Sequence, residues 1–175
     1  MNKTKLSLFI LSLFMFNLLF AQETTTSSIP NQTSFFAELG GPGILFSANI
    51  DRRFTKSNLG VGGRIGIGFV TDEFGDTYNY EPKSILTLPV QLNYIFGKPN
   101  SVHSFEVGAG VTFTGKKIDL FSYNDTKFQS AFATASFMYR RQPADGGFSW
   151  RLGFTPIISG SYVQPSGGVS IGYNF

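Results

Sequence analysis

The chain has 175 residues and a formal net charge of +3, from 14 Lys and Arg against 11 Asp and Glu. Only 14% of its residues are charged, whereas 16% are aromatic, including 20 Phe. This aromatic content excludes an intrinsically disordered chain. The absence of Cys excludes a disulfide scaffold, and the small net charge argues against a nucleic-acid-binding surface. The length suits a single domain.

The first 21 residues have the pattern of a secretory signal peptide. Lys3 and Lys5 precede an apolar stretch over Leu6–Phe20, and Ala21 is the small residue before the expected cleavage site. The apolar stretch is shorter than the ~20 residues that a membrane-spanning helix needs. We therefore expect export and cleavage, followed over residues 22–33 by a flexible lead-in with no Cys for a lipid anchor.

From residue 34 onwards, apolar residues alternate with small or polar residues. Val61, Ile65 and Ile67 share one face of their segment, for example, while Arg64 and several glycines fall on the other. This period of two predicts β-strands with one apolar face. Turn signals divide the barrel domain, residues 34–175, into eight strands. The predicted strands are Ser34–Gly40, Gly43–Phe54, Leu59–Thr71, Ser84–Phe96, Val102–Lys116, Lys127–Arg141, Gly147–Ser159 and Gly167–Phe175.

The connections between these strands alternate in length. Short turns over 55–58, 97–101 and 142–146 alternate with polar loops over 72–83, 117–126 and 160–166, and the tight turn Gly40–Gly43 is the exception. Short periplasmic turns, longer outside loops and an even strand number are typical of outer-membrane barrels. The expected fold class is therefore all-β, a closed antiparallel eight-stranded transmembrane β-barrel. Phe132 falls out of phase with Phe137 and Tyr139, which predicts a bulge in that strand.

Alternation alone does not decide whether the apolar face points outward, as in a membrane barrel, or inward, as in a soluble lipocalin-like barrel. The other face is rich in Gly, Ser and Thr and carries few Lys, unlike a surface in water. It also carries charges of both signs, which can pair inside a narrow barrel. The predicted lumen network comprises Glu38, Asp51, Arg53, Arg64, Glu106 and Arg151, with Arg140 as a further candidate.

Aromatic residues on the apolar face also favour the membrane interpretation. They gather near the short turns, as in the girdles that lie at the level of lipid headgroups. The predicted girdle comprises Phe54, Tyr94, Phe96, Phe105, Tyr139, Phe148, Trp150, Tyr173 and Phe175, with Phe69 and Phe113 near the other rim.

One ion pair of the lumen can be predicted from the turn that joins two strands. If Phe54 pairs with Leu59, then Asn49 lies opposite Arg64. Asp51 is then the diagonal neighbour of Arg64, within reach of its long side chain. The guanidinium of arginine can donate two parallel hydrogen bonds to one carboxylate.

The chain resembles the small eight-stranded outer-membrane β-barrel proteins of Gram-negative bacteria, similar in plan to OmpX and to the barrel domain of OmpA. The likeness rests on strand number, loop asymmetry, the stretches FFAELGG, SANIDRRF and FEVGAGVTF, and the ending GGVSIGYNF. The resemblance implies that this ending is read by the outer-membrane assembly machinery. The residues that would form this signal are Val169, Ile171, Tyr173 and Phe175.

Few residues suggest chemistry. His103 lies beside Ser101 and Ser104, and a Ser–His pair could serve acyl transfer, but no nucleophile elbow is present, so a histidine in a turn is the better interpretation. The loop over 72–83 is acidic through Asp72, Glu73, Asp76 and Glu81, so calcium could bind there, but the loop lacks the spacing of an EF-hand and a solvated loop is the better interpretation. We therefore expect no catalytic residues, no cofactor and no bound metal.

Three functions remain open at this point. The first is a non-enzymatic envelope barrel with a side-chain-filled lumen and a structural or loop-mediated binding or adhesion role. The second is a narrow pore or lateral-diffusion channel for small molecules, and the third a lipid-modifying enzyme. The expected location is the outer membrane. The expected partners are its lipid and the assembly machinery, with no nucleic acid, and the protein is expected to be a monomer.

We predict that the mature protein begins at Gln22, because Ala21 follows a charged start and an apolar stretch. Mass spectrometry of the N-terminal peptide of the exported protein checks this. An intact Met1 on that protein would contradict the prediction.

Overall fold

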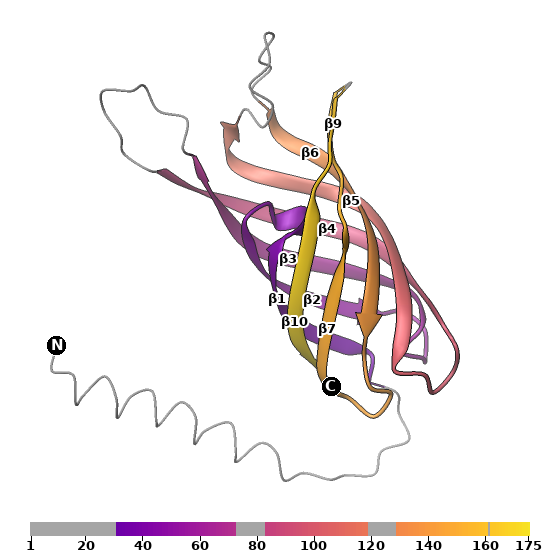
Figure 1. Cartoon of the computed structure of the whole chain (residues 1–175). Helices are drawn as coiled ribbons and strands as arrows, with labels where there is room; N and C mark the ends of the chain where they lie inside the picture. The colour runs from indigo at the N-terminus through magenta and orange to yellow at the C-terminus, as the bar shows by residue number, and fades with distance from the viewer. Residues whose placement is uncertain (1–30, 73–82, 119–128, 161) are drawn as a thin grey trace, which may run out of the picture.

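The computed structural model describes residues 31–72, 83–118, 129–160 and 162–175, which form one β-barrel (Figure 1). The predicted signal peptide and most of the lead-in lie outside the described residues, as do 73–82 and 119–128. The elements are β1 (Thr33–Gly40), the 3₁₀ turn η2 (Gly41–Gly43), β2 (Phe46–Arg53), β3 (Gly60–Asp72), β4 (Lys83–Gly97), β5 (His103–Ile118), β6 (Gln129–Arg141), β7 (Gly147–Phe154), β8 (Ile157–Ser159), β9 (Tyr162–Gln164) and β10 (Gly167–Asn174).

The sheet closes on itself through antiparallel pairs. Strands β1 to β7 follow one another around the barrel, and β10 pairs with both β7 and β1. At the seam the backbones of Thr33 and Phe175 exchange two hydrogen bonds of 2.9 and 3.1 Å. Closure removes unpaired strand edges, which hydrocarbon would not tolerate. Within the described residues, no helix has the length and apolar character to cross a membrane.

The ten β segments form eight barrel strands, because two strands are interrupted at prolines. Phe137 lies opposite Phe154 and Thr134 opposite Ile157, so β7 and β8 keep one register against β6. The N–H of Ala135 donates to the carbonyl of Pro156 between them. Proline cannot donate in return, which explains why the predicted strand Gly147–Ser159 is divided.

The last connection was predicted wrongly as a loop over 160–166. Segment β9 instead pairs with β8 and continues the register of β10 past Pro165, with Ile157 opposite Gln164 and Phe154 opposite Gly167. Strands β8 and β9 therefore extend as a β-ribbon beyond the end of the barrel at which β3 ends and β4 begins (Figure 1).

The predicted bulge at Phe132 is wrong. This side chain points inward, 3% exposed, in phase with the buried Thr134, Ser136 and Met138. Because Phe132 is a large aromatic residue on the otherwise polar face, the alternation pattern resembles that of a strand with a shifted register. The register between β5 and β6 shifts elsewhere, between Phe113 and Ile118.

The first hairpin also departs from the prediction, because β2 begins at Phe46 rather than Gly43. The chain leaves β1 through Gly40 and Gly41, with φ of 69° and 68°, and turns into the barrel as η2. All three η2 residues are buried. A side chain at Gly41 would collide with the carboxylate of Glu38, so this turn requires glycine.

The apolar face of the sheet points outward, as predicted for a membrane barrel. Ile50, Ile65 and Val90 are paired across β2, β3 and β4 near mid-strand, and all three are exposed. The predicted girdle residues also lie on this outer surface, and Tyr94 and Phe96 contact one another at 4.5 Å between ring centroids. The alternative of a soluble barrel with an apolar interior is therefore wrong.

We predict that Ile65→Lys lowers the free energy of unfolding by about 2–4 kcal/mol, because it places a charge near the middle of the apolar belt. Val61→Lys is the matched control on the same strand, close to the short-turn rim, with a cost of about 0–1 kcal/mol. Urea unfolding of both variants in lipid vesicles measures the difference. Equal costs at the two positions would contradict the outward orientation of a lipid-covered mid-strand surface.

Candidate functional site

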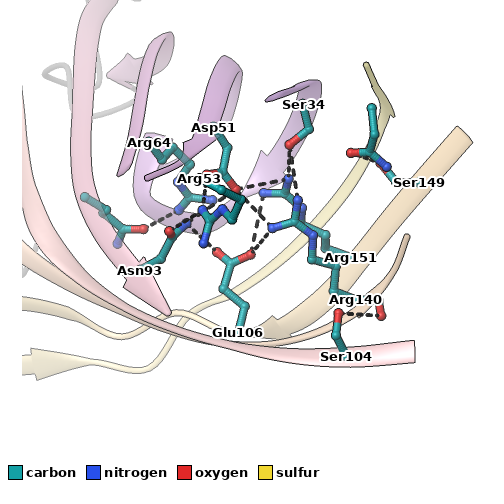
Figure 2. Close-up of polar contacts among 12 residues, drawn as sticks. Ser34, Asp51, Arg53, Arg64, Asn93, Ser104, Glu106, Arg140, Ser149 and Arg151 are labelled. Carbon is teal, nitrogen blue, oxygen red and sulfur yellow. Dashed lines mark hydrogen bonds and ion pairs between the residues drawn. The ribbon is translucent and has the colours of Figure 1, made fainter. Parts of the chain in front are cut away.

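The middle of the lumen is filled by charged side chains that come from six strands. Each is at most 3% exposed. They are Glu38 on β1, Asp51 and Arg53 on β2, Arg64 on β3, Glu106 on β5, Arg140 on β6 and Arg151 on β7. Figure 2 shows those of β2, β3, β5, β6 and β7. Charges removed from water are stable only when paired, so the contacts among these seven residues define the site.

Asp51 contacts three arginines. Its carboxylate is 3.0 Å from Arg140 and 3.4 Å from Arg151, and it also pairs with Arg53 two residues further along β2. The Arg53 guanidinium also donates a hydrogen bond to the side-chain oxygen of Asn93 on β4. Asp51 therefore links β2 to the strands on the opposite side of the barrel.

Glu106 is the second carboxylate at the centre. It accepts a hydrogen bond of 2.8 Å from Arg140, lies 3.8 Å from Arg151, and accepts one of 3.2 Å from the amide of Asn93. Arg140 and Arg151 also both donate to the hydroxyl of Ser34, at 3.1 and 2.9 Å. Each of these two arginines therefore contacts both central carboxylates and β1.

Arg64 and Glu38 form a looser pair beside this centre, at 3.4 Å. Arg64 also donates to the side-chain oxygen of Gln91 at 2.5 Å, and Gln91 in turn donates to Thr134 at 2.9 Å. The ring of Phe36 lies 5.5 Å from the Arg64 guanidinium and 3.8 Å from that of Arg151. Cation–π contacts of this kind give buried arginines an additional partner.

The lumen is closed toward the long connections by η2. The hydroxyls of Thr87 on β4 and Thr112 on β5 donate to the carbonyls of Gly43 and Pro42, at 3.1 and 2.8 Å. Near this end, a small apolar cluster also fills the barrel. It consists of Ile85, Phe132 and Ile157, with Ile44 and Val70 packed against it.

The seven charged residues comprise four arginines and three carboxylates, so the site carries one formal positive charge in excess. Because these side chains are almost completely buried, water has no room to line them as it lines an open pore. The arrangement can therefore cross-link the strands and exclude solvent. Each of the three carboxylates forms an ion pair with an arginine. Among the described residues, no cluster of His, Asp and Glu could hold a metal.

The structure places all six predicted lumen residues inside the barrel, together with Arg140. The predicted contact between Arg64 and Asp51 is wrong, however, as is the register on which it was based. Phe54 pairs with Val61 rather than Leu59, which puts Asp51 directly opposite Arg64. Even so, Arg64 extends to Glu38 and Gln91. The neutral partners Ser34, Gln91 and Asn93 were not predicted, although strand alternation places them on the inward face.

The residues that suggested acyl transfer do not form a Ser–His pair. The hydroxyl of Ser101 is bonded to the backbone of His103, at 3.1 and 3.2 Å, and Ser104 points into the lumen. The imidazole contacts the hydroxyl of Tyr139 instead. Of the acidic loop, Glu73, Asp76 and Glu81 lie outside the described residues.

The proposed C-terminal signal residues lie on the outer face of β10 or directly after it. Val169, Ile171, Tyr173 and Phe175 are all exposed, and the first three pair with residues of β1 and β7. This placement leaves their apolar side chains accessible from the lipid side, and their role in assembly stays a prediction.

A closed antiparallel eight-stranded barrel with an apolar outer face and a polar, filled lumen defines the class of small outer-membrane-type β-barrels. The fold is similar to the crystal structure of the N-terminal β-barrel domain of Pseudomonas aeruginosa OprF. The match covers 82% of this chain and 96% of that domain, with 15% sequence identity and a TM-score of 0.56. No family model and no curated protein sequence matches the chain.

We predict that Arg140→Ala destabilises the barrel by about 3–5 kcal/mol, because it leaves Asp51 and Glu106 short of a buried partner. Lys98→Ala is the matched control, since Lys98 is exposed in a short turn, and we expect a change within about 0.5 kcal/mol. Denaturant unfolding in detergent micelles or vesicles measures both. Similar values for the two variants would mean that the lumen contacts contribute little.

Proposed function

We propose that this protein is a non-enzymatic integral protein of the outer membrane whose barrel is closed by its own side chains. Its role would then be structural, or one of binding and adhesion through the outside loops. The single observation that carries this proposal is the buried network around Asp51 and Glu106, which crosses the whole width of the lumen.

The outward face supports placement in a membrane. Exposed aliphatic residues cover mid-strand positions, and aromatic residues gather toward the short-turn rim. The likeness to the OprF barrel domain supports the outer membrane of a Gram-negative envelope in particular. We infer that the mature barrel is a monomer, that lipid surrounds it, and that the assembly machinery binds β10 during insertion.

The main competing function is a narrow pore. The polar lumen and its excess positive charge would suit a channel for anions if the central ion pairs opened. The network and η2 both oppose this, because they occupy successive levels of the same interior. Conductance separates the two functions directly.

We predict that the purified wild-type barrel gives no steady conductance in planar bilayers, because its lumen is filled. The double variant Arg140→Ala, Glu106→Ala removes one arginine and one carboxylate together, so it leaves the net charge unchanged and opens space in the centre. Because η2 and the apolar cluster of Ile85, Phe132 and Ile157 still close the lumen at another level, we expect the double variant to stay silent as well. Lys98→Ala should also stay silent, as the control. Reproducible wild-type channels would overturn the closed-barrel proposal and favour the pore.

A further inference from the structure

Three neighbouring strands carry a cluster of rings on the outer face near the short-turn rim. Tyr139 on β6 lies at its centre, with ring centroids 5.6 Å from Phe105 on β5 and 5.4 Å from Trp150 on β7. The imidazole of His103 stacks on the Tyr139 ring, with 5.9 Å between the two ring centroids, and its Nδ1 lies 2.5 Å from the Tyr139 hydroxyl. When the Tyr139 hydroxyl donates this hydrogen bond, the imidazole of His103 carries its proton on Nε2, where the N–H is available to a ligand.

A cation lies within this group of rings. Arg141 is paired with His103 on one side and with Trp150 on the other. Its guanidinium makes no ion pair or hydrogen bond with any side chain in the described part of the protein. We name His103, Phe105, Tyr139, Arg141 and Trp150 the inner-rim cluster. It combines an unpaired fork of N–H donors with aromatic surface.

The same rim is positively charged around the barrel. Arg52 at the end of β2, Lys56 in the next turn and Lys98 in the turn before β5 are all exposed. Among the described residues of this rim, Asp145 is the acidic residue that faces them, and it too is exposed. Four cationic side chains including that of Arg141 therefore lie at this rim with one acidic side chain, and the rim attracts anions.

An apolar wall rises from the cluster along the same three strands. Val107 on β5, Phe137 on β6 and Leu152 on β7 are 36%, 55% and 57% exposed. A ligand that fits the whole surface must therefore be negatively charged at one end and hydrocarbon along the rest.

We propose that the inner-rim cluster is a binding site for an anionic phospholipid of the leaflet at the short-turn side. Arg141 would hold the phosphate with two N–H groups, His103 would donate from Nε2, and the acyl chains would lie along the wall of β5, β6 and β7. Guanidinium binds phosphate in this forked geometry, and Tyr and Trp favour the headgroup level. The inference rests on the proposed membrane function.

Native mass spectrometry of the purified protein in detergent micelles tests the site. Phosphatidylglycerol and phosphatidylcholine with the same acyl chains are the probes. We expect phosphatidylglycerol to be retained in preference, and Arg141→Gln to weaken its binding about fivefold, since one cation near a membrane surface contributes about 1 kcal/mol. Arg141→Lys keeps the charge without the fork and should recover part of the affinity.

Lys116→Gln is the control, because it removes an exposed cation of β5 at the opposite end of the barrel. It should leave binding unchanged. Equal retention of the two lipids, or equal loss in Arg141→Gln and Lys116→Gln, would overturn the site. Displacement of phosphatidylglycerol by an equal concentration of inorganic phosphate would reassign it to a free anion. Cell fractionation tests the membrane function separately, because the micelle measurement does not depend on cellular location.

Discussion

The narrow bore of an eight-stranded barrel brings its inward-facing charges into contact with one another. Arg140 reaches both Asp51 and Glu106 because no strand lies far from any other across the lumen. Each of these charges has lost its hydration, so stability depends on the pairing being complete. Closure of the channel is then a consequence of the strand number together with the choice of polar residues.

A second constraint comes from the backbone, since hydrocarbon offers it no hydrogen-bonding partners. The barrel meets this constraint by pairing β1 with β10. Its two strand interruptions occur at Pro156 and Pro165, toward the rim of the long connections, and the hydrogen bond from Thr155 to Ser166 continues the ladder between them. These two interruptions therefore lie where the strands leave the membrane-facing belt, whereas Pro89 interrupts the pairing of β4 with β3 within the belt.

The faces of the strands could be predicted because side-chain direction has a strict period of two. Glu38, Arg64 and Arg151 are accordingly inside the barrel. The same rule would have identified Gln91 and Asn93, which lie in phase on β4. Partner choice could not be predicted, because it depends on register and on distances across the lumen. An error of two residues in one turn displaced Asp51 relative to Arg64.

The inward position of the first hairpin turn could not be predicted from the sequence either. Gly40–Gly43 indicates a tight turn, but its inward direction depends on the hydroxyls of Thr87 and Thr112, which lie far along the chain. The residues of such a turn determine its shape. Its position in the barrel depends on hydrogen-bonding partners that are distant in the sequence.

Ser34 and Arg151, which share a hydrogen bond, are 117 residues apart, and Asp51 and Arg140 are 89 apart. Contacts of such separation form only after most of the chain has been ordered, which slows folding. Until β6 and β7 join the sheet, the carboxylate of Glu106 lacks both of its arginines, Arg140 and Arg151, and has Asn93 as its side-chain partner. A partly assembled sheet would thus expose uncompensated charge to lipid, and the last strands should join in one cooperative step that commits the barrel to its native state.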